Sequence, residues 1–315
     1  MSVPTTYSFN RYLAAKKSVD DRALNQHVWH SLAHALPAAA RLAPVRILEV
    51  GAGIGTMVER LVTRGFLTHA AYTAIDADPE TIAESQRRLP GWMADQGFSV
   101  TEDVPGQWHF LRPGHDLRVE TEAIDLLSFM AHGRGQRAWD LLIAHALLDV
   151  LDIPSIMPGL LSLLRPGGLF YFTIAFDGAT VLQPEIDAGL DTQIEALYHQ
   201  TMDQRRIAGQ PCGDSHTGRH LFSHLQAAGT ELIDVGSSDW VIFAGPHGYP
   251  GDEAYFLHFI IHTIDTALQG HPQLNPERFA AWIARRHAQV EQGSLVYIAH
   301  QLDFLGRVPA PVSCG

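Results

Sequence analysis

The sequence has little cysteine, no excess of basic residues and no long apolar run. Its two cysteines, Cys212 and Cys314, exclude a disulfide framework and favour a reducing compartment. The 22 Lys and Arg against 34 Asp and Glu give a formal net charge of −12, which argues against nucleic acid as the main partner. No window has the apolar length of a membrane helix, and the first residues lack the apolar stretch of a signal peptide. We therefore expect a soluble, cytoplasmic protein with no membrane partner.

Hydrophobic residues make up 46% of the 315 residues and charged residues 18%, which is typical of a globular protein. From residue 45 onwards, short apolar runs alternate with helical patterns, and this alternation predicts an α/β fold with a parallel sheet. The expected strands are 45–50, 71–76, 117–124 (after a hairpin), 139–144, 169–176, 240–243 and 295–298, and expected helices include 8–43, 217–228, 252–269 and 276–292. We interpret residues 1–44 as a helical cap on one domain, 45–315, with insertions at about 178–214 and 246–292.

A glycine-rich loop, Gly51–Gly55, follows the first expected strand and precedes a helix. Glycines permit a sharp turn and let a ligand lie against bare backbone, and a helix N-terminus offers unpaired amides. The dinucleotide fingerprint prefers Gly or Ala at the sixth position, which is Thr56 here. Glu49 would repel a pyrophosphate but suits a ligand with an ammonium group. The sequence therefore favours a cofactor that carries an ammonium group over a dinucleotide.

Two acids follow in the next unit. Asp76 ends the second expected strand, where an acid can bind ribose hydroxyls, although a strand-end cap is the simpler alternative. Asp78 precedes Pro79, and we expect it to cap the helix that begins there.

Four segments resemble the successive motifs of the class I S-adenosylmethionine-dependent methyltransferases: Leu48–Thr56, Tyr72–Pro79, Trp139–Ala144 and Leu164–Gly168. The resemblance covers roughly residues 45–176. It implies a doubly wound, seven-stranded, mostly parallel sheet with an antiparallel last strand, and S-adenosylmethionine as the cofactor. Added helices are then expected to cover the rim of the active site.

The cofactor contacts that follow from this resemblance are Glu49, Gly51, Ala52, Gly53, Gly55, Asp76, Ala77, Asp125, Leu126, Ala144 and His145. The glycine loop would lie behind the methionine part, and Asp76 would hold the ribose. Asp125 matches the residue that contacts the adenine amino group, although a solvated loop acid explains it equally well. Ala144 and His145 match positions beside the sulfur.

Ligands of open α/β sheets bind beyond the carboxyl ends of the strands, and polar residues in segments able to cover that rim are our substrate candidates. They are Tyr12, Arg22, Asp177, Asp214, His216 and Arg219. Tyr12 and Arg22 belong to a stretch of mixed charge, Tyr12–Arg22, which a solvated helix face also explains. A capping loop would explain Ser215 or Thr217 but leaves the charged residues beside them unexplained.

The predicted reaction is methyl transfer to oxygen or nitrogen of a small molecule. A phenol or alcohol acceptor would need a general base, for which His145 and His216 are the candidates, whereas an amine only has to arrive neutral.

The chain has 18 histidines, some at helical spacing, but the pairs His258/His262 and His216/His220 lack a clear third ligand. We expect no metal site, and we expect His258 and His262 to be core or pocket residues.

Three alternatives remain open. The chain could be an NAD(P)-dependent oxidoreductase, an aminopropyl transferase, or a non-catalytic S-adenosylmethionine-binding module whose added helices mediate dimerisation. A homodimer is also compatible with the enzyme.

Overall fold

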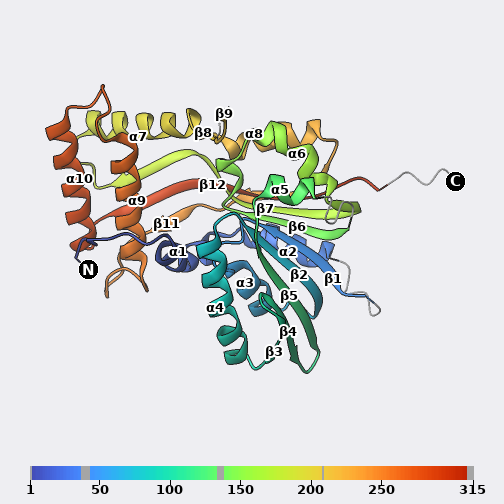
Figure 1. The fold of residues 1–315 in the computed structure, drawn as a ribbon. Coiled ribbons are helices and arrows are strands. Elements are labelled where there is room, and N and C mark those ends of the chain that lie inside the picture. The colour runs from blue at the N-terminus through green and yellow to red at the C-terminus, as the bar shows by residue number, and fades with distance from the viewer. Residues whose placement is uncertain (1, 37–42, 133–137, 208, 311–315) are drawn as a thin grey trace.

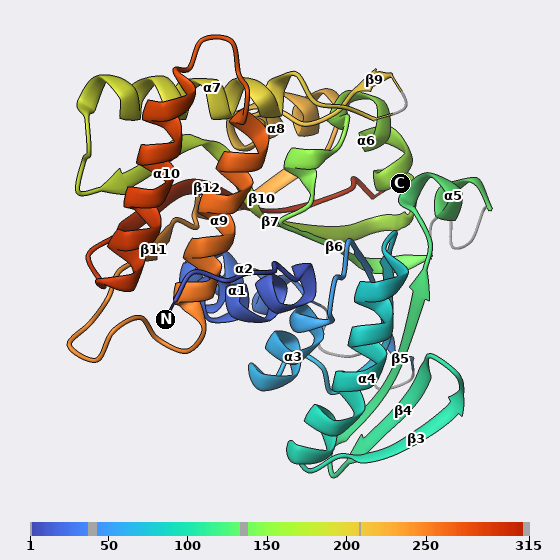
Figure 2. The same ribbon diagram turned by 60° about the vertical axis from the view of Figure 1, so that its left-hand side comes forward.

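The computed structural model describes residues 2–36, 43–132, 138–207 and 209–310, so residues 37–42 of the predicted cap and Cys314 lie outside the described part. A ten-stranded sheet runs through the molecule with helices on both faces (Figures 1 and 2). Seven strands form its core in the order β5-β2-β1-β6-β7-β12-β10, and only β12 opposes the direction of the other six. The predicted doubly wound, mostly parallel sheet with an antiparallel last strand is confirmed.

The core strands are β1 (Val45–Val50), β2 (His69–Asp76), β5 (His115–Ala123), β6 (Trp139–His145), β7 (Leu164–Gln183), β10 (Glu231–Ser237) and β12 (Val296–Arg307). Three further strands bring the sheet to ten: the antiparallel hairpin of β3 (Ser99–Val104) and β4 (Gln107–Arg112), and β11 (Trp240–Ile242). A separate two-stranded ribbon joins β8 (Arg206–Ile207) to β9 (Gln210–Pro211).

The structure differs from the expected strands in three respects. β10 was not predicted, because it is an edge strand whose residues are mostly half-buried and show no clear alternation of apolar and polar side chains. The predicted strand at 240–243 is the short β11, which pairs only with β12 and lies off the main path of the sheet. β7 and β12 are also much longer than expected, with 20 and 12 residues.

Helices cover both faces of the core sheet, and the central strands are therefore buried on both sides. One face carries α2 (Gln26–Ala35), α3 (Thr56–Thr63) and α4 (Pro79–Asp95), and the other carries α5 (Leu126–Ala131), α6 (Ile153–Ser162) and α8 (Thr217–Ala227). Asp78 caps α4 by accepting a hydrogen bond from the Glu80 amide at 2.8 Å, as predicted. Among the described residues, no helix is both long enough and apolar enough to cross a membrane.

The last residues of β7 (Thr180–Gln183) and the first residues of β12 (Val296–Ala299) extend beyond the core sheet. Together with β11 they form a region that we call the wing. α7 (Ala188–Asp203), α9 (Glu253–Leu268) and α10 (Pro276–Glu291) pack around this wing (Figure 1), and the last two confirm the predicted helices. α1 (Phe9–Ala23) packs against α9 and β11. The added helices thus lie beside the carboxyl end of the core sheet, where they form walls of the site described below.

The close approach of β12 to β7 and β10 requires glycine at position 306. An added Cβ at Gly306 would lie 2.2 Å from Cζ of Phe170 and 2.7 Å from the carbonyl oxygen of Glu231. We expect Gly306→Ala to lower the free energy of unfolding by about 1–3 kcal/mol, because a backbone atom and a packed ring must both move. Gly91→Ala in α4, where a Cβ meets nothing within 4 Å, is the control and should be neutral or slightly stabilising. Urea unfolding measures both variants, and equal stability of the two would contradict the packing described here.

Candidate active site

A cavity of about 450 Å³ opens beyond the carboxyl ends of β1, β2 and β6. Parallel strands of an open sheet bring their carboxyl ends to one edge, so loops that are distant in sequence meet there. Of the residues predicted for cofactor and substrate, the cavity is lined by Tyr12, Glu49, Gly51, Ala52, Gly53, Asp76 and His145.

The glycine loop leaves β1 in a conformation that suits glycine. Gly51, Gly53 and Gly55 have φ angles of +69°, +52° and +81°, which strain residues with side chains. A Cβ on Gly51 would also lie 2.8 Å from Cδ1 of Leu147 in the loop that follows β6. The first and second glycines thus present bare backbone to the cavity.

Asp76 connects the end of β2 to this loop. One carboxylate oxygen accepts the amide hydrogen of Gly53 at 2.8 Å, and the other accepts that of Asp78 at 2.9 Å. Asp76 therefore does cap backbone amides at the end of its strand, as the simpler alternative expects. Because Asp76 also lines the cavity, its predicted contact with a ribose stays open.

Glu49, at the end of β1, is a buried acid with a single close donor. The hydroxyl of Tyr72 donates to its Oε2 at 2.7 Å. Burial raises the pKa of Glu49 to about 8, although the Tyr72 hydrogen bond and the charge of Arg60 act in the opposite direction. At neutral pH the side chain is therefore mostly protonated.

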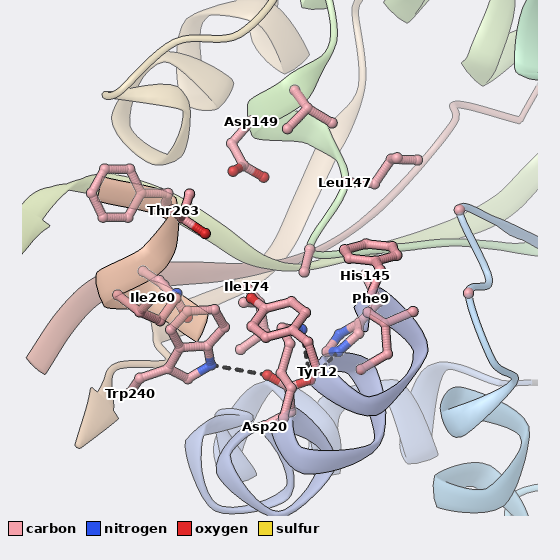
Figure 3. A pocket seen from close by; sticks show the side chains of 18 of the residues that line it. Phe9, Tyr12, Asp20, His145, Leu147, Asp149, Ile174, Trp240, Ile260 and Thr263 are labelled. Carbon is pink, nitrogen blue, oxygen red and sulfur yellow. Dashed lines mark hydrogen bonds and ion pairs between the residues drawn. The ribbon is translucent and has the colours of Figure 1, made fainter. Parts of the chain in front are cut away.

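Asp20 of α1 is the centre of a buried network below the cavity (Figure 3). Its carboxylate is 2.7 Å from Nζ of Lys16, 2.9 Å from Nε2 of His145 and 3.3 Å from Nη2 of Arg60, and it accepts the indole hydrogen of Trp240 at 2.9 Å. Burial alone would raise the pKa of Asp20, but Lys16, His145 and Arg60 outweigh it and hold the pKa far below its usual value. Asp20 is therefore ionised.

The solvated interpretation of the stretch Tyr12–Arg22 is wrong for Lys16 and Asp20, which are 6% and 2% exposed. They lie one turn apart on the face of α1 that meets the sheet, and each compensates the charge of the other.

His145 ends β6 and uses both ring nitrogens in contacts with the protein. Nε2 faces the Asp20 carboxylate, and Nδ1 lies 2.8 Å from Oγ1 of Thr173. Burial is the main reason that the pKa of His145 falls to about 4, so the imidazole is neutral. Donation from Nε2 to the carboxylate leaves Nδ1 to accept the Thr173 hydroxyl hydrogen. Its proposed role as a general base stays a prediction, and the geometry instead suits a residue that holds the loop after β6.

The remaining substrate candidates lie outside the cavity lining. Arg22 pairs with Glu253 at 2.6 Å, and Asp177 pairs with Arg219 of α8 at 2.8 Å. Asp177 was expected after the end of its strand, at the rim. It is instead inside β7, which continues to Gln183, and it is therefore held against α8.

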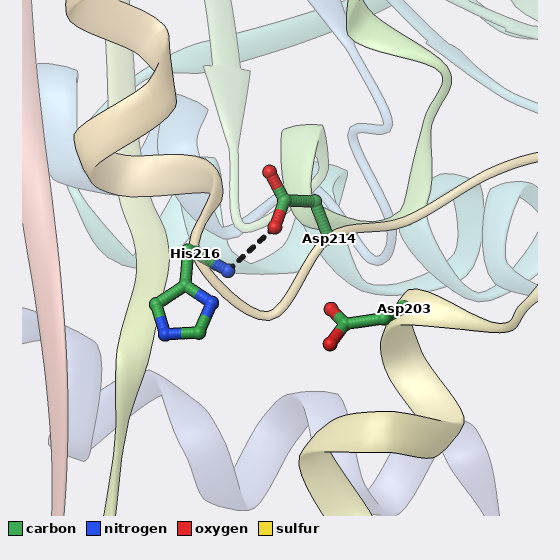
Figure 4. A group of neighbouring side chains, drawn as sticks. All are labelled: Asp203, Asp214 and His216. Carbon is green, nitrogen blue, oxygen red and sulfur yellow. Dashed lines mark hydrogen bonds between the residues drawn. The ribbon is translucent and has the colours of Figure 1, made fainter.

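Asp214 and His216 also lie outside the lining, in the loop before α8 (Figure 4). The Asp214 carboxylate accepts the amide hydrogen of His216 at 2.8 Å, and Asp203 accepts that of Ser215 at 2.8 Å. Asp203, Asp214 and His216 present possible metal-ligand atoms within 4.8 Å of one another. These backbone hydrogen bonds explain the cluster as a loop-holding arrangement, and we assign no ion to it.

The other predicted cofactor contacts, Gly55, Ala77, Asp125, Leu126 and Ala144, do not line this cavity. Ala144 is buried within β6. Asp125 is exposed and caps α5 by accepting from the Ser128 amide at 2.9 Å, as the solvated-acid alternative expects. Its contact with an adenine stays a prediction.

His258 and His262 lie in the helix pair of the wing. His258 is fully buried, and its Nδ1 is 2.9 Å from Nδ1 of His287 in α10. His262 stacks on Tyr7 with ring centroids 4.0 Å apart. The predicted core position is confirmed for His258.

Sequence reasoning missed most of the outer half of the cavity. Its aromatic wall consists of Phe9, Tyr12, Phe176, Tyr198, Trp240, Phe259 and Tyr297, and its charged lining includes Asp149 and Arg205. Tyr12 stacks on Phe259 with centroids 4.2 Å apart. These residues come from six helices and strands and from two connecting segments, so no local spacing links them.

Comparisons with known proteins find limited similarity. No family model matches the chain. It is 29% identical over 204 residues to a trans-aconitate 2-methyltransferase of Methylobacterium nodulans, which covers 64% of this chain and 58% of the relative. The chain thus matches less than two thirds of the length of that relative.

Solved structures with similar architecture include a putative type II methyltransferase from Anaeromyxobacter dehalogenans, with a TM-score of 0.48, 15% identity and coverage of 90% of this chain and 97% of that one. Another is a putative sarcosine dimethylglycine methyltransferase from Galdieria sulphuraria, with a TM-score of 0.43, 13% identity and coverage of 93% and 86%. Likeness at this level carries no information about activity.

The Asp20 network yields a stability prediction. Asp20→Asn removes the anion that Lys16 and Arg60 share, and breaking one side of a buried ion pair lowers the free energy of unfolding by about 3–5 kcal/mol. Asp252→Asn is the control, because the Arg11–Asp252 pair is 2.7 Å long but lies at the surface, where a pair contributes about 1 kcal/mol or less. Urea unfolding measures both variants. Similar losses of unfolding free energy in the two variants would show that the buried Asp20 pairs stabilise the protein no more than a surface ion pair does.

Proposed function

We propose that the chain is a class I S-adenosylmethionine-dependent methyltransferase, which binds S-adenosylmethionine at the β1 loop and methylates a small molecule on oxygen or nitrogen. The observation that supports this most directly is the continuity of the cavity, in which the Gly51–Gly53 backbone, Glu49 and Asp76 line one part and an aromatic wall lines the rest. A cofactor and an acceptor would therefore meet in one space.

The residues present fit such a cofactor. The bare backbone at Gly51, where a Cβ would clash with Leu147, forms a cradle for its methionine part, and Glu49 suits the ammonium group. Asp76, the acid at the end of β2, would accept hydrogen bonds from the ribose.

Once bound, the cofactor supplies an activated methyl group on a sulfonium. The chain contributes alignment and exclusion of water, because displacement at the methyl carbon requires the acceptor atom in line with the breaking bond. The network of Asp20, His145 and Thr173 fixes the loop after β6, and the aromatic residues exclude water from the acceptor side.

Two other functions would give different experimental results from methyl transfer. A non-catalytic module would bind the cofactor but form no S-adenosylhomocysteine with any acceptor. An NAD(P)-dependent oxidoreductase would bind a pyrophosphate beside Glu49. A cytoplasmic location, a homodimer and the absence of a nucleic-acid partner stay predictions from composition.

Binding of S-adenosylhomocysteine, measured by calorimetry, tests the proposal. We expect Asp76→Ala to weaken this binding by roughly ten-fold or more, because charge-assisted hydrogen bonds to the ribose are lost. Asp103→Ala, an exposed acid of β3, should leave the affinity unchanged. The proposal fails if the wild-type protein has no measurable affinity for this nucleoside.

The raised pKa of Glu49 predicts that binding releases a proton. The empty site holds Glu49 mostly protonated at pH 7, and the ammonium group of the cofactor stabilises its ionised form, so cofactor affinity should rise as pH increases from about 6 towards the Glu49 pKa of about 8. Calorimetry at pH 7 in two buffers of different ionisation enthalpy should show release of most of one proton for the wild type and little for Glu49→Gln. A pyrophosphate would instead keep Glu49 protonated. Equal release by both proteins would remove Glu49 from the ammonium site.

A further inference from the structure

Asp149 is an acid that lines the outer part of the cavity. It takes no part in the network around Asp20. It lies in the short turn η1 (Leu148–Val150), four residues after His145, and Figure 3 shows its carboxylate pointing into the cavity. Apart from its own backbone amide, no residue in the described part of the chain donates a hydrogen bond to this carboxylate or pairs with it within 4.0 Å. Burial raises the pKa of Asp149, and its own backbone amide compensates the charge only in part, so a ligand that donates a hydrogen bond would stabilise the ionised carboxylate.

The surroundings of Asp149 are aromatic. Tyr12 and Tyr198 lie close enough for its charge to act on them: burial is the main cause of the raised pKa of Tyr198, about 12, and the Asp149 carboxylate raises it further. Trp240, Phe259 and the ring of Tyr12 form walls of the same space. Flat rings favour an acceptor with an aromatic or similarly apolar body, which can stack on them.

The charges lining the cavity disfavour an acceptor with several carboxylates. Of the two cations in the lining, Lys16 is already paired with Asp20 at 2.7 Å, which leaves Arg205. Arg205 acts on the Asp149 carboxylate from the same end of the cavity. A tricarboxylate such as trans-aconitate, named in the relative above, would bring three negative charges to a space that offers one uncompensated cation.

We propose that the acceptor is an aromatic molecule with an O–H or N–H group that hydrogen-bonds to Asp149, and that Asp149 takes its proton during methyl transfer. This inference rests on the function proposed above. Neither histidine considered as a base offers what Asp149 offers, since His145 uses both nitrogens within the protein and His216 lies outside the cavity lining.

The step balances without a further reagent. The lone pair of the acceptor oxygen or nitrogen forms a bond to the methyl carbon, and the carbon–sulfur bond breaks with its electron pair moving to sulfur. The hydrogen of the O–H or N–H group passes to the Asp149 carboxylate. The products are the methylated acceptor, S-adenosylhomocysteine and a protonated Asp149, which returns its proton to water.

Two probes that differ in one hydroxyl test this assignment without knowledge of the natural acceptor. 4-Ethylphenol and ethylbenzene are titrated by ligand-observed NMR into protein saturated with S-adenosylhomocysteine. We expect 4-ethylphenol to bind the wild type more tightly than ethylbenzene. In Asp149→Asn its affinity should fall by roughly ten-fold, whereas that of ethylbenzene should stay the same.

Asp152→Asn is the matched control, because Asp152 lies three residues further along, outside the cavity lining, with its carboxylate bound to the Ser155 hydroxyl. It should bind both probes as the wild type does. Failure of 4-ethylphenol to bind at millimolar concentration overturns the proposed acceptor class, and equal weakening of both probes in Asp149→Asn reduces Asp149 to a structural role. Loss of S-adenosylhomocysteine binding by the wild type would instead overturn the function on which the inference rests.

Discussion

The buried carboxylate of Asp20 joins four parts of the chain that are far apart in sequence. Lys16 lies beside it on α1, Arg60 reaches it from α3, His145 from the end of β6 and Trp240 from β11. A buried charge is stable only when it is paired and hydrogen-bonded, so these elements have to pack around the Asp20 carboxylate. α1 is consequently part of the cavity wall, and the loop after β6 has a fixed position relative to the glycine loop.

The two buried acids Asp20 and Glu49 both line the cavity, and their contacts explain why they differ in charge. Asp20 has two cations and an imidazole within 3.3 Å and remains ionised. Among the described residues, Glu49 has only the Tyr72 hydroxyl as a close donor, and burial raises its pKa to about 8. The structural network therefore carries its charge permanently, whereas the acid beside the glycine loop becomes charged when a cation arrives. Under the proposed function, this difference would let the site bind a cationic cofactor without an unpaired buried anion in its empty state.

Features that depend on adjacent residues could be predicted from the sequence, and features that depend on distant ones could not. The glycine loop, Asp76 and the Asp78 cap each follow a strand end within a few residues, and the structure places all three where the pattern indicates. Asp177 was misplaced because nothing local shows that β7 continues past it. The burial of Asp20 and the cavity position of Asp149 depend on partners 40 to 220 residues away or on the tertiary packing of the wing.

The two halves of the cavity differ in the same way, and this difference bears on the acceptor under the proposed function. The half beside β1 and β2 is built from backbone and a few residues of two short segments, so it can persist while most of the sequence changes. The outer half draws Tyr12, Tyr198, Trp240 and Phe259 from helices and strands throughout the chain. Substitutions of Tyr12, Tyr198 or Phe259, whose side chains form no hydrogen bond in the Asp20 network, would alter its shape while that network stays in place. Under the proposed function, similarity over 64% of the chain is compatible with an acceptor that differs from the one in the name of the relative, and the pairing of Lys16 with Asp20 supports that proposal.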